Sequence, residues 1–239
     1  MIASVVGVVE GSYNYFAELE TASKCLEWVK DHMALDEINI YLEKICVSET
    51  NESIYVNLYD FMMEEIKDVP AGSHSVIFTP WLHGNRCPFE DPNARGMFFN
   101  IRLETGKRDM IHAVIEGICY HLRWQLEAQD KKLETSKTIR FVGGGALSSL
   151  TCRTIADILG RDIETIENPQ NAGALGAAVV VAVGLGILKG IEEAERLIKV
   201  REVYHPDLKN KNLHDRNFQV FKSLYKNNRK AFRRLNQRI

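Results

Sequence analysis

Apolar residues recur at helical spacing over five stretches of the chain. The first stretch has them at i, i+4, i+7 and i+11, so they share one face of a helix: Ala22, Leu26, Val29 and Met33. The same spacing predicts further helices, with apolar stripes at residues 35–45, 58–66, 111–126 and 218–232. Pro70 is expected to end the third helix, and Thr105 to cap the fourth.

Residues 172–186 differ, because they are apolar nearly all round. A helix without a polar face is expected inside a core, so this pattern predicts a buried central helix. Short runs rich in β-branched residues predict strands near the N-terminus and at residues 74–79, 97–103, 138–142 and 162–166. Strands that alternate with helices indicate an α/β domain.

The pattern also predicts one helix end, one break in the chain and one long loop. Gly160 is placed to end a helix that runs through Ile155 and Leu159, and Asn168-Pro169 breaks the chain after the last predicted strand. Residues 80–98 have no regular period and hold three prolines, Pro80, Pro88 and Pro92, together with Gly84 and Gly96, which predicts a long ordered loop. Asp91 and Arg95 are expected to form an ion pair that folds this loop.

Composition excludes several classes of protein. The chain has 239 residues, of which 45% are hydrophobic and 26% charged, so it is neither disordered nor collagen-like and needs no disulfide staple. Its five cysteines are odd in number and form no Cys-x-x-Cys pair, which favours free thiols in a reducing cytoplasm and argues against a zinc site. His83 is expected at the surface, and the spacing of His112 and His121 suits no metal site. No stretch predicts a membrane span or a signal peptide.

Charge is concentrated at the C-terminus. Residues 209–239 hold ten Lys and Arg and one acid, Asp215, and so carry a net charge of +9. Their aromatic residues lie at helical spacing, which favours a basic amphipathic helix that packs on the domain. Nucleic acid is the disfavoured interpretation, since no known reading module accompanies the charge.

A glycine-rich turn is the strongest local signal for chemistry. Gly143-Gly-Gly-Ala follows a predicted strand and precedes a predicted helix. Glycines allow close approach of a ligand to the backbone, and a helix N-terminus attracts phosphate, so this turn suits a nucleotide. A tight strand–helix turn without a ligand is the equal alternative. The P-loop pattern is absent, and Ser148 stands where a dinucleotide fingerprint requires Gly.

Four further blocks of the sequence form a recognisable set. They lie at residues 79–98 (Thr-Pro-Trp-Leu-His-Gly-Asn-Arg), 113–117 (Ala-Val-Ile-Glu-Gly), 141–160 (Phe-Val-Gly-Gly-Gly-Ala-Leu-Ser-Ser to Ala-Asp-Ile-Leu-Gly) and 172–178 (Ala-Gly-Ala-Leu-Gly-Ala-Ala). In this order they resemble the C-terminal domain of the FGGY carbohydrate kinases, most closely the xylulokinase-like members. The resemblance implies an actin-like, ribonuclease-H-like ATPase fold, the C-terminal half of a two-domain sugar kinase, over residues 1–239. Asn85 replaces the usual Glu of the first block.

The resemblance also implies a function and a site. ATP, with Mg²⁺, would donate its γ-phosphate to a sugar hydroxyl, on a pentulose such as xylulose, in a cytoplasmic enzyme. By position, the adenosine site comprises Gly144, Gly145, Ala146, Ser149, Ser23 and Glu27. Ser23 stands where the family often has Gly.

The same resemblance places the catalytic Asp and most sugar contacts in an N-terminal kinase domain, which this chain lacks, so no catalytic residue is assigned. The expected partners are that domain, ATP or ADP and the sugar, without a membrane; a homodimer is left open. The alternative is a free-standing regulatory or interaction domain derived from such a kinase.

Overall fold

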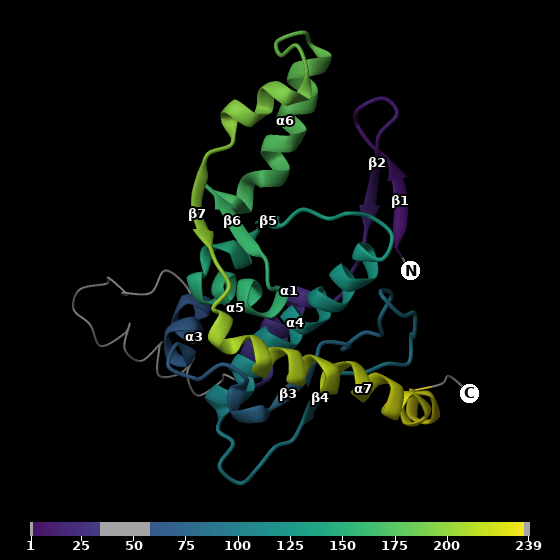
Figure 1. Cartoon of the computed structure of the whole chain (residues 1–239), viewed down its shortest axis with the longest axis vertical. Coiled ribbons are helices and arrows are strands. Elements are labelled where there is room, and N and C mark those ends of the chain that lie inside the picture. Colours follow the sequence, from purple (N-terminus) through teal and green to yellow (C-terminus); the bar gives the residue numbers. More distant parts are fainter. Residues whose placement is uncertain (1, 34–57, 237–239) are drawn as a thin grey trace, which may run out of the picture. The chain divides into compact units, whose positions relative to one another are not determined.

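The chain forms two compact units, each assembled from segments that are distant in the sequence. The computed structural model describes residues 2–33 and 58–236 (Figure 1). The first unit comprises Met1–Glu18, Arg86–Glu90 and Leu122–Lys211, and the second comprises Leu19–Asn85, Asp91–His121 and Asn212–Ile239. The predicted helix at residues 35–45 lies outside the described residues.

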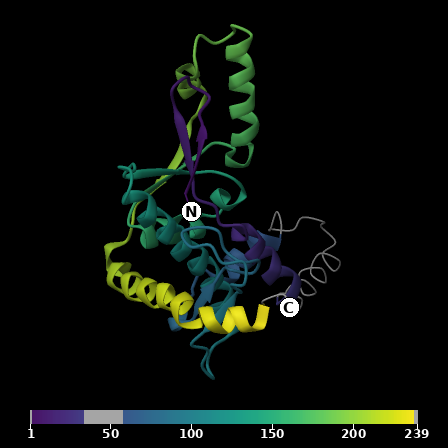
Figure 2. The ribbon, with the colours of Figure 1, turned by 90° about the vertical axis from the view of Figure 1, so that its right-hand side faces the viewer.

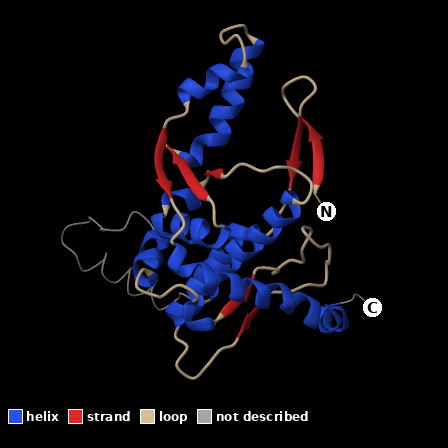
Figure 3. Ribbon diagram, viewed as in Figure 1, coloured by secondary structure: helices blue, strands red, loops and turns tan. Residues whose placement is uncertain are grey.

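Helices predominate over strands (Figure 3). The α-helices are α1 (Ala22–His32), α3 (Leu58–Ile66), α4 (Lys107–Asp130), α5 (Ser149–Leu159), α6 (Ala172–Gly184) and α7 (Lys211–Asn236). The strands are β1 (Ala3–Val6), β2 (Tyr13–Phe16), β3 (Ile77–Thr79), β4 (Met97–Phe99), β5 (Thr138–Phe141), β6 (Asp162–Ile166) and β7 (Val200–Tyr204). The mixed α/β composition agrees with the sequence pattern.

The sheet of the first unit has the order β5-β6-β7 among the described residues. β5 and β6 are parallel, with Thr138 opposite Asp162, and β7 runs antiparallel to β6. α5 connects the two parallel strands, as a parallel pair requires a crossover, and it buries Cys152, Ile155 and Ile158. Because β5 and β6 are parallel, the loops that follow them emerge at the same edge of the sheet.

Both ends of α5 follow from the sequence. The Ser148 side chain accepts a hydrogen bond of 3.2 Å from the Thr151 N–H, which satisfies one free donor of the first turn. At the other end Gly160 has φ +64° and its N–H bonds the carbonyl of Ala156. A left-handed residue at this position favours glycine, so the predicted helix end at Gly160 is confirmed.

The core of the second unit lies between α4 and α7. α7 buries Phe218, Phe221 and Leu224, and the ring of the fully buried Trp81 lies 5.6 Å from that of Phe221. The hydroxyl of Tyr120 lies 2.9 Å from Nδ1 of His214, which links the two helices. Aromatic burial of this extent stabilises a helix that would be too polar to pack otherwise.

The prediction that residues 172–186 form a buried helix is wrong about burial. The helix forms, but within the described residues only Val179 of α6 is buried, while Val180, Val181 and Leu185 are exposed. α6 packs on the short 3₁₀-helices Pro169–Asn171 and Ile191–Leu197 (Figures 1 and 2). An apolar sequence creates a tendency to be covered, but the three-stranded sheet of this unit offers too little surface to cover α6.

Two local predictions are also corrected. Thr105 does not cap α4; its hydroxyl accepts the N–H of Arg102, and the carboxylate of Asp109 accepts the N–H of Gly106 instead. Asp91 and Arg95 do not pair. The Arg95 guanidinium donates to the carbonyls of Pro92 and Ala94, because these lie within reach in the same turn.

The loop at residues 80–98 is nevertheless ordered. Asn85 and Asp91 exchange two backbone hydrogen bonds of 3.0 and 2.9 Å, and the Asp91 carboxylate accepts the hydroxyl of Tyr225. His83 is exposed, as predicted. Over residues 2–33 and 58–236, no helix is both long and apolar enough to cross a membrane.

Candidate functional site

A glycine turn, residues 143–149, follows β5 and opens α5. Gly143 has φ +92° and ψ −177°, a conformation that is open essentially to glycine alone. A 3₁₀-helix, Gly144–Leu147, follows, and the N–H of Ala146 bonds the carbonyl of Gly143 at 3.1 Å. Gly143 therefore redirects the chain into the 3₁₀-helix after β5, and Ala146, which is buried, anchors the turn in the unit.

Gly144 and Gly145 are both exposed, but they differ in what surrounds them. A Cβ at Gly144 would meet no heavy atom of the described chain within 4 Å. A Cβ at Gly145 would lie 3.0 Å from Cζ of Phe141. The space beside Gly144 is therefore open to an approaching molecule, whereas the missing side chain of Gly145 makes room for a neighbouring ring.

The N-terminus of α5 completes the turn. Ser149 is the first residue of this helix and is exposed, next to the capping residue Ser148. The first N–H groups of a helix have no intrahelical acceptor, and the helix dipole adds partial positive charge there. Polar or anionic atoms are therefore favoured at this end of the turn.

A second loop lies at the same edge of the sheet. It follows β6, and its Pro169 carbonyl accepts the N–H of Gly143 at 2.8 Å. In open α/β sheets, ligands bind beside the carboxyl ends of parallel strands. The two loops thus meet where the architecture favours a ligand. Sequence reasoning identified Asn168-Pro169 only as a chain break, and the parallel strand before it was the signal for a larger role.

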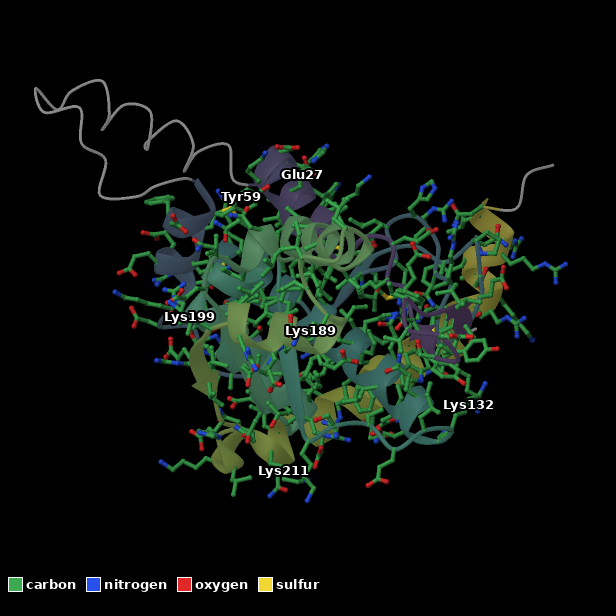
Figure 4. All side chains as sticks on the ribbon, turned by 90° about the horizontal axis from the view of Figure 1, so that it is seen from above. Glu27, Tyr59, Lys132, Lys189, Lys199 and Lys211 are labelled. Carbon is green, nitrogen blue, oxygen red and sulfur yellow. The ribbon has the colours of Figure 1, made fainter. Side chains whose placement is uncertain are left out.

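The six predicted site residues fall into two groups. Gly144, Gly145, Ala146 and Ser149 lie together in the glycine turn of the first unit. Ser23 and Glu27 are four residues apart on α1, in the second unit, and both are exposed. Figure 4 labels Glu27. The structure thus brings four of the six together.

A buried polar cluster that the sequence analysis missed lies in the second unit. The Glu116 carboxylate accepts the N–H of Gly72 at 2.6 Å and the hydroxyl of Ser73 at 2.7 Å. The Ser73 hydroxyl also lies 2.9 Å from Nδ1 of His112. These residues hold a turn in which Ser73 has a positive φ, and all of them are buried, which makes the cluster structural. Burial lowers the pKa of His112 to about 4, with a further contribution from the charge of His214.

Metal-binding side chains do not gather in the described part of the chain: no group of three or more His, Cys, Asp or Glu could hold an ion there. The glycine turn offers backbone donors and open space beside Gly144.

Comparisons with known proteins show which family the chain resembles. The family model described as "FGGY family of carbohydrate kinases, C-terminal domain" matches residues 2–185. The xylulose kinase of Staphylococcus epidermidis is 35% identical over 168 residues, which are 68% of this chain and 34% of that protein. The chain thus spans about a third of the length of the curated relatives it matches.

Solved structures show a similar fold. The xylulose kinase of Rhodospirillum rubrum superposes with a TM-score of 0.74 at 22% identity, over 97% of this chain and 43% of that one. The glycerol kinase of Plasmodium falciparum, solved with ADP, superposes with a TM-score of 0.70 at 16% identity, over 94% of this chain and 42% of that one. At these identities the likeness concerns the fold alone.

Proposed function

Since the chain belongs to the FGGY family of carbohydrate kinases, with the actin-like fold of their C-terminal domain, we propose that it forms the adenosine-binding side of a sugar-kinase active site. The glycine turn is the proposed site. ATP is the proposed nucleotide, and Gly144, Gly145, Ala146 and Ser149 are its proposed contacts. Ser23 and Glu27 of α1 are proposed nucleotide contacts as well, on the resemblance to the family alone.

The observation that carries this proposal is the open space at Gly144 beside the first N–H groups of α5. Nothing in the described chain fills the position that a Cβ would take there, although the neighbouring Gly145 is closed by Phe141. A turn that only connected a strand to a helix would not need an open glycine between Gly143 and Gly145. A flat ribose or adenine face, by contrast, can approach the backbone only where no side chain intervenes.

The proposed chemistry is phosphoryl transfer from ATP to a sugar hydroxyl. Catalysis of such transfers depends on positioning and on electrostatic stabilisation of the phosphoryl group. The residues of this chain would hold and orient adenosine, and backbone N–H groups at the start of α5 would face polar atoms of the nucleotide. Mg²⁺ would neutralise phosphate charge; its ligands are proposed to lie in the N-terminal part of the kinase, together with the sugar site and the catalytic base.

A pentulose such as xylulose is the proposed sugar. The relative with 35% identity is a xylulose kinase, while a glycerol kinase shares the fold at lower identity. The proposed partner that completes the active site is the N-terminal kinase domain.

The test compares two glycine substitutions in which the added side chain meets open space. Gly144→Val should abolish or strongly weaken ATP binding, because its side chain would occupy the proposed path of adenosine. Gly184→Val is the matched control, since a Cβ there also meets nothing within 4 Å of the described chain. Gly145→Val is less informative, because contact with Phe141 would disturb the turn itself.

Calorimetric titration of ATP and ADP into the wild type and both variants measures the effect. The expected result is binding by the wild type and Gly184→Val and loss of binding by Gly144→Val, with unchanged melting temperatures. Equal binding by folded Gly144→Val would show that the turn is only a connection and that the site lies elsewhere.

A further inference from the structure

We propose that Asn168, through the left-handed turn it forms before Pro169, is a positioning residue that sets the conformation of the glycine turn for nucleotide binding. The proposal rests on the proposed function and assigns to it a residue that makes no contact with the nucleotide. Asn168 would act through the backbone of Pro169 and Gly143.

The geometric link is a single hydrogen bond between the two loops. The Gly143 N–H donates to the Pro169 carbonyl at 2.8 Å. Gly143 is the point at which the chain leaves β5, and its φ of +92° orients everything that follows in the turn. Fixing its N–H therefore fixes the direction in which Gly144 and Gly145 present their backbones.

The Pro169 carbonyl has a second donor. It also accepts the N–H of Ala172, the first residue of α6. One buried proline thus holds the start of the glycine turn and the start of the next helix together. A shift of this carbonyl would loosen both at once.

Asn168 determines where that carbonyl lies. Its φ of +49° and ψ of +56° are left-handed, and its own carbonyl accepts the N–H of Asn171 at 2.9 Å. The preceding residue, Glu167, is fixed to the Lys199 carbonyl at 2.9 Å. The chain must therefore turn between two fixed points within one residue, and Asn tolerates the left-handed region that this requires.

The side chain of Asn168 is exposed, so its backbone conformation carries the effect. Two substitutions at this position should therefore have different effects, according to whether the new residue can adopt the left-handed conformation. Asn168→Gly keeps access to the left-handed region and should preserve the turn. Asn168→Val removes that access, because β-branched residues avoid it, at about 1–2 kcal/mol.

Asn100 offers a matched control. It also has a positive φ, of +66°, but it lies in the second unit and outside the two loops. Asn100→Val should impose a comparable backbone strain and also remove the 3.0 Å hydrogen bond that the Asn100 amide donates to the Ser75 carbonyl, so its melting temperature should fall at least as far. It should leave ATP binding unchanged, which distinguishes positioning from general destabilisation.

Two measurements on the full chain test the proposal. Hydrogen exchange of the Gly143 amide, followed by NMR without nucleotide, should accelerate about five- to thirtyfold in Asn168→Val and stay near wild type in Asn168→Gly and Asn100→Val. The Kd for ATP should weaken by a similar factor in Asn168→Val alone, since binding must restore the turn.

Several results would overturn the proposal. Wild-type affinity in Asn168→Val would do so, whether or not Gly143 exchange accelerates. Equal loss of affinity in Asn168→Gly would assign the effect to the side chain instead. A wild-type chain that binds no ATP would overturn the proposed function, and with it the role in binding, while Gly143 exchange would still decide whether Asn168 sets the turn.

Discussion

At the scale of residues, the three glycines of the turn have three different reasons to be glycine. Gly143 needs a backbone conformation that side chains rarely adopt, and Gly145 makes room for the ring of Phe141. Gly144 has neither constraint, because its conformation is ordinary and its surroundings are open. The proposed ligand would explain only the glycine at position 144, and no sequence pattern distinguishes this glycine from the other two.

The buried His112 predicts a dependence of stability on pH. Its pKa is lowered to about 4 from an ordinary value of 6.5, because burial disfavours the charged imidazolium. The unfolded chain therefore binds a proton that the folded chain does not between these two pH values. Stability is fully present above pH 6.5 and should fall by up to about 3 kcal/mol as the pH drops to 4.

Urea unfolding at pH 7, 5.5 and 4 measures this effect. His112→Gln is the comparison, because it keeps a polar group near Ser73 but cannot titrate. The free energy of unfolding of the wild type should decrease more steeply with falling pH than that of the variant. Parallel pH profiles would show that His112 carries no part of the acid sensitivity.

At the scale of elements, α6 gives the clearest prediction. Val181 is 59% exposed and Val179 is 6% exposed on the same helix. Val181→Glu should change the free energy of unfolding by no more than about 0.5 kcal/mol. It should also reduce the binding of an apolar dye, since Val181 lies within an uncharged exposed surface. Val179→Glu should lower the melting temperature substantially, because it buries an unpaired carboxylate.

The opposite result would be informative. If Val181→Glu destabilised the chain as strongly as Val179→Glu, α6 would be covered in solution. Sedimentation at several concentrations would then show whether a second copy of the chain covers it, which is the homodimer that the sequence left open.

The sequence predicted the positions of helices and strands better than their burial and their long-range contacts. Strand β6 and the helix end at Gly160 followed from local pattern and from the conformation that glycine permits. The burial of α6 did not, because burial depends on which other elements lie nearby. The hydrogen bond from Gly143 to Pro169 joins residues 26 positions apart, so no local sequence pattern could predict it.

At the scale of the whole molecule, the chain corresponds to about a third of its relatives. The resemblance to the family places the catalytic Asp in the N-terminal domain. We therefore expect the chain by itself not to phosphorylate xylulose or glycerol. A coupled assay of ADP release across these compounds tests this, and turnover at ordinary kinase rates of about 1–100 per second would contradict it.

The central claim is that the glycine turn binds an adenine nucleotide. The most direct measurement is a titration of ATP into the ¹⁵N-labelled chain, followed by the shifts of its backbone amides. The account predicts the largest shifts in residues 143–149, with smaller ones in residues 168–172. Shifts confined to the cationic α7, as expected of phosphate held by surface charge alone, or no shifts in the glycine turn at saturating ATP, would contradict it.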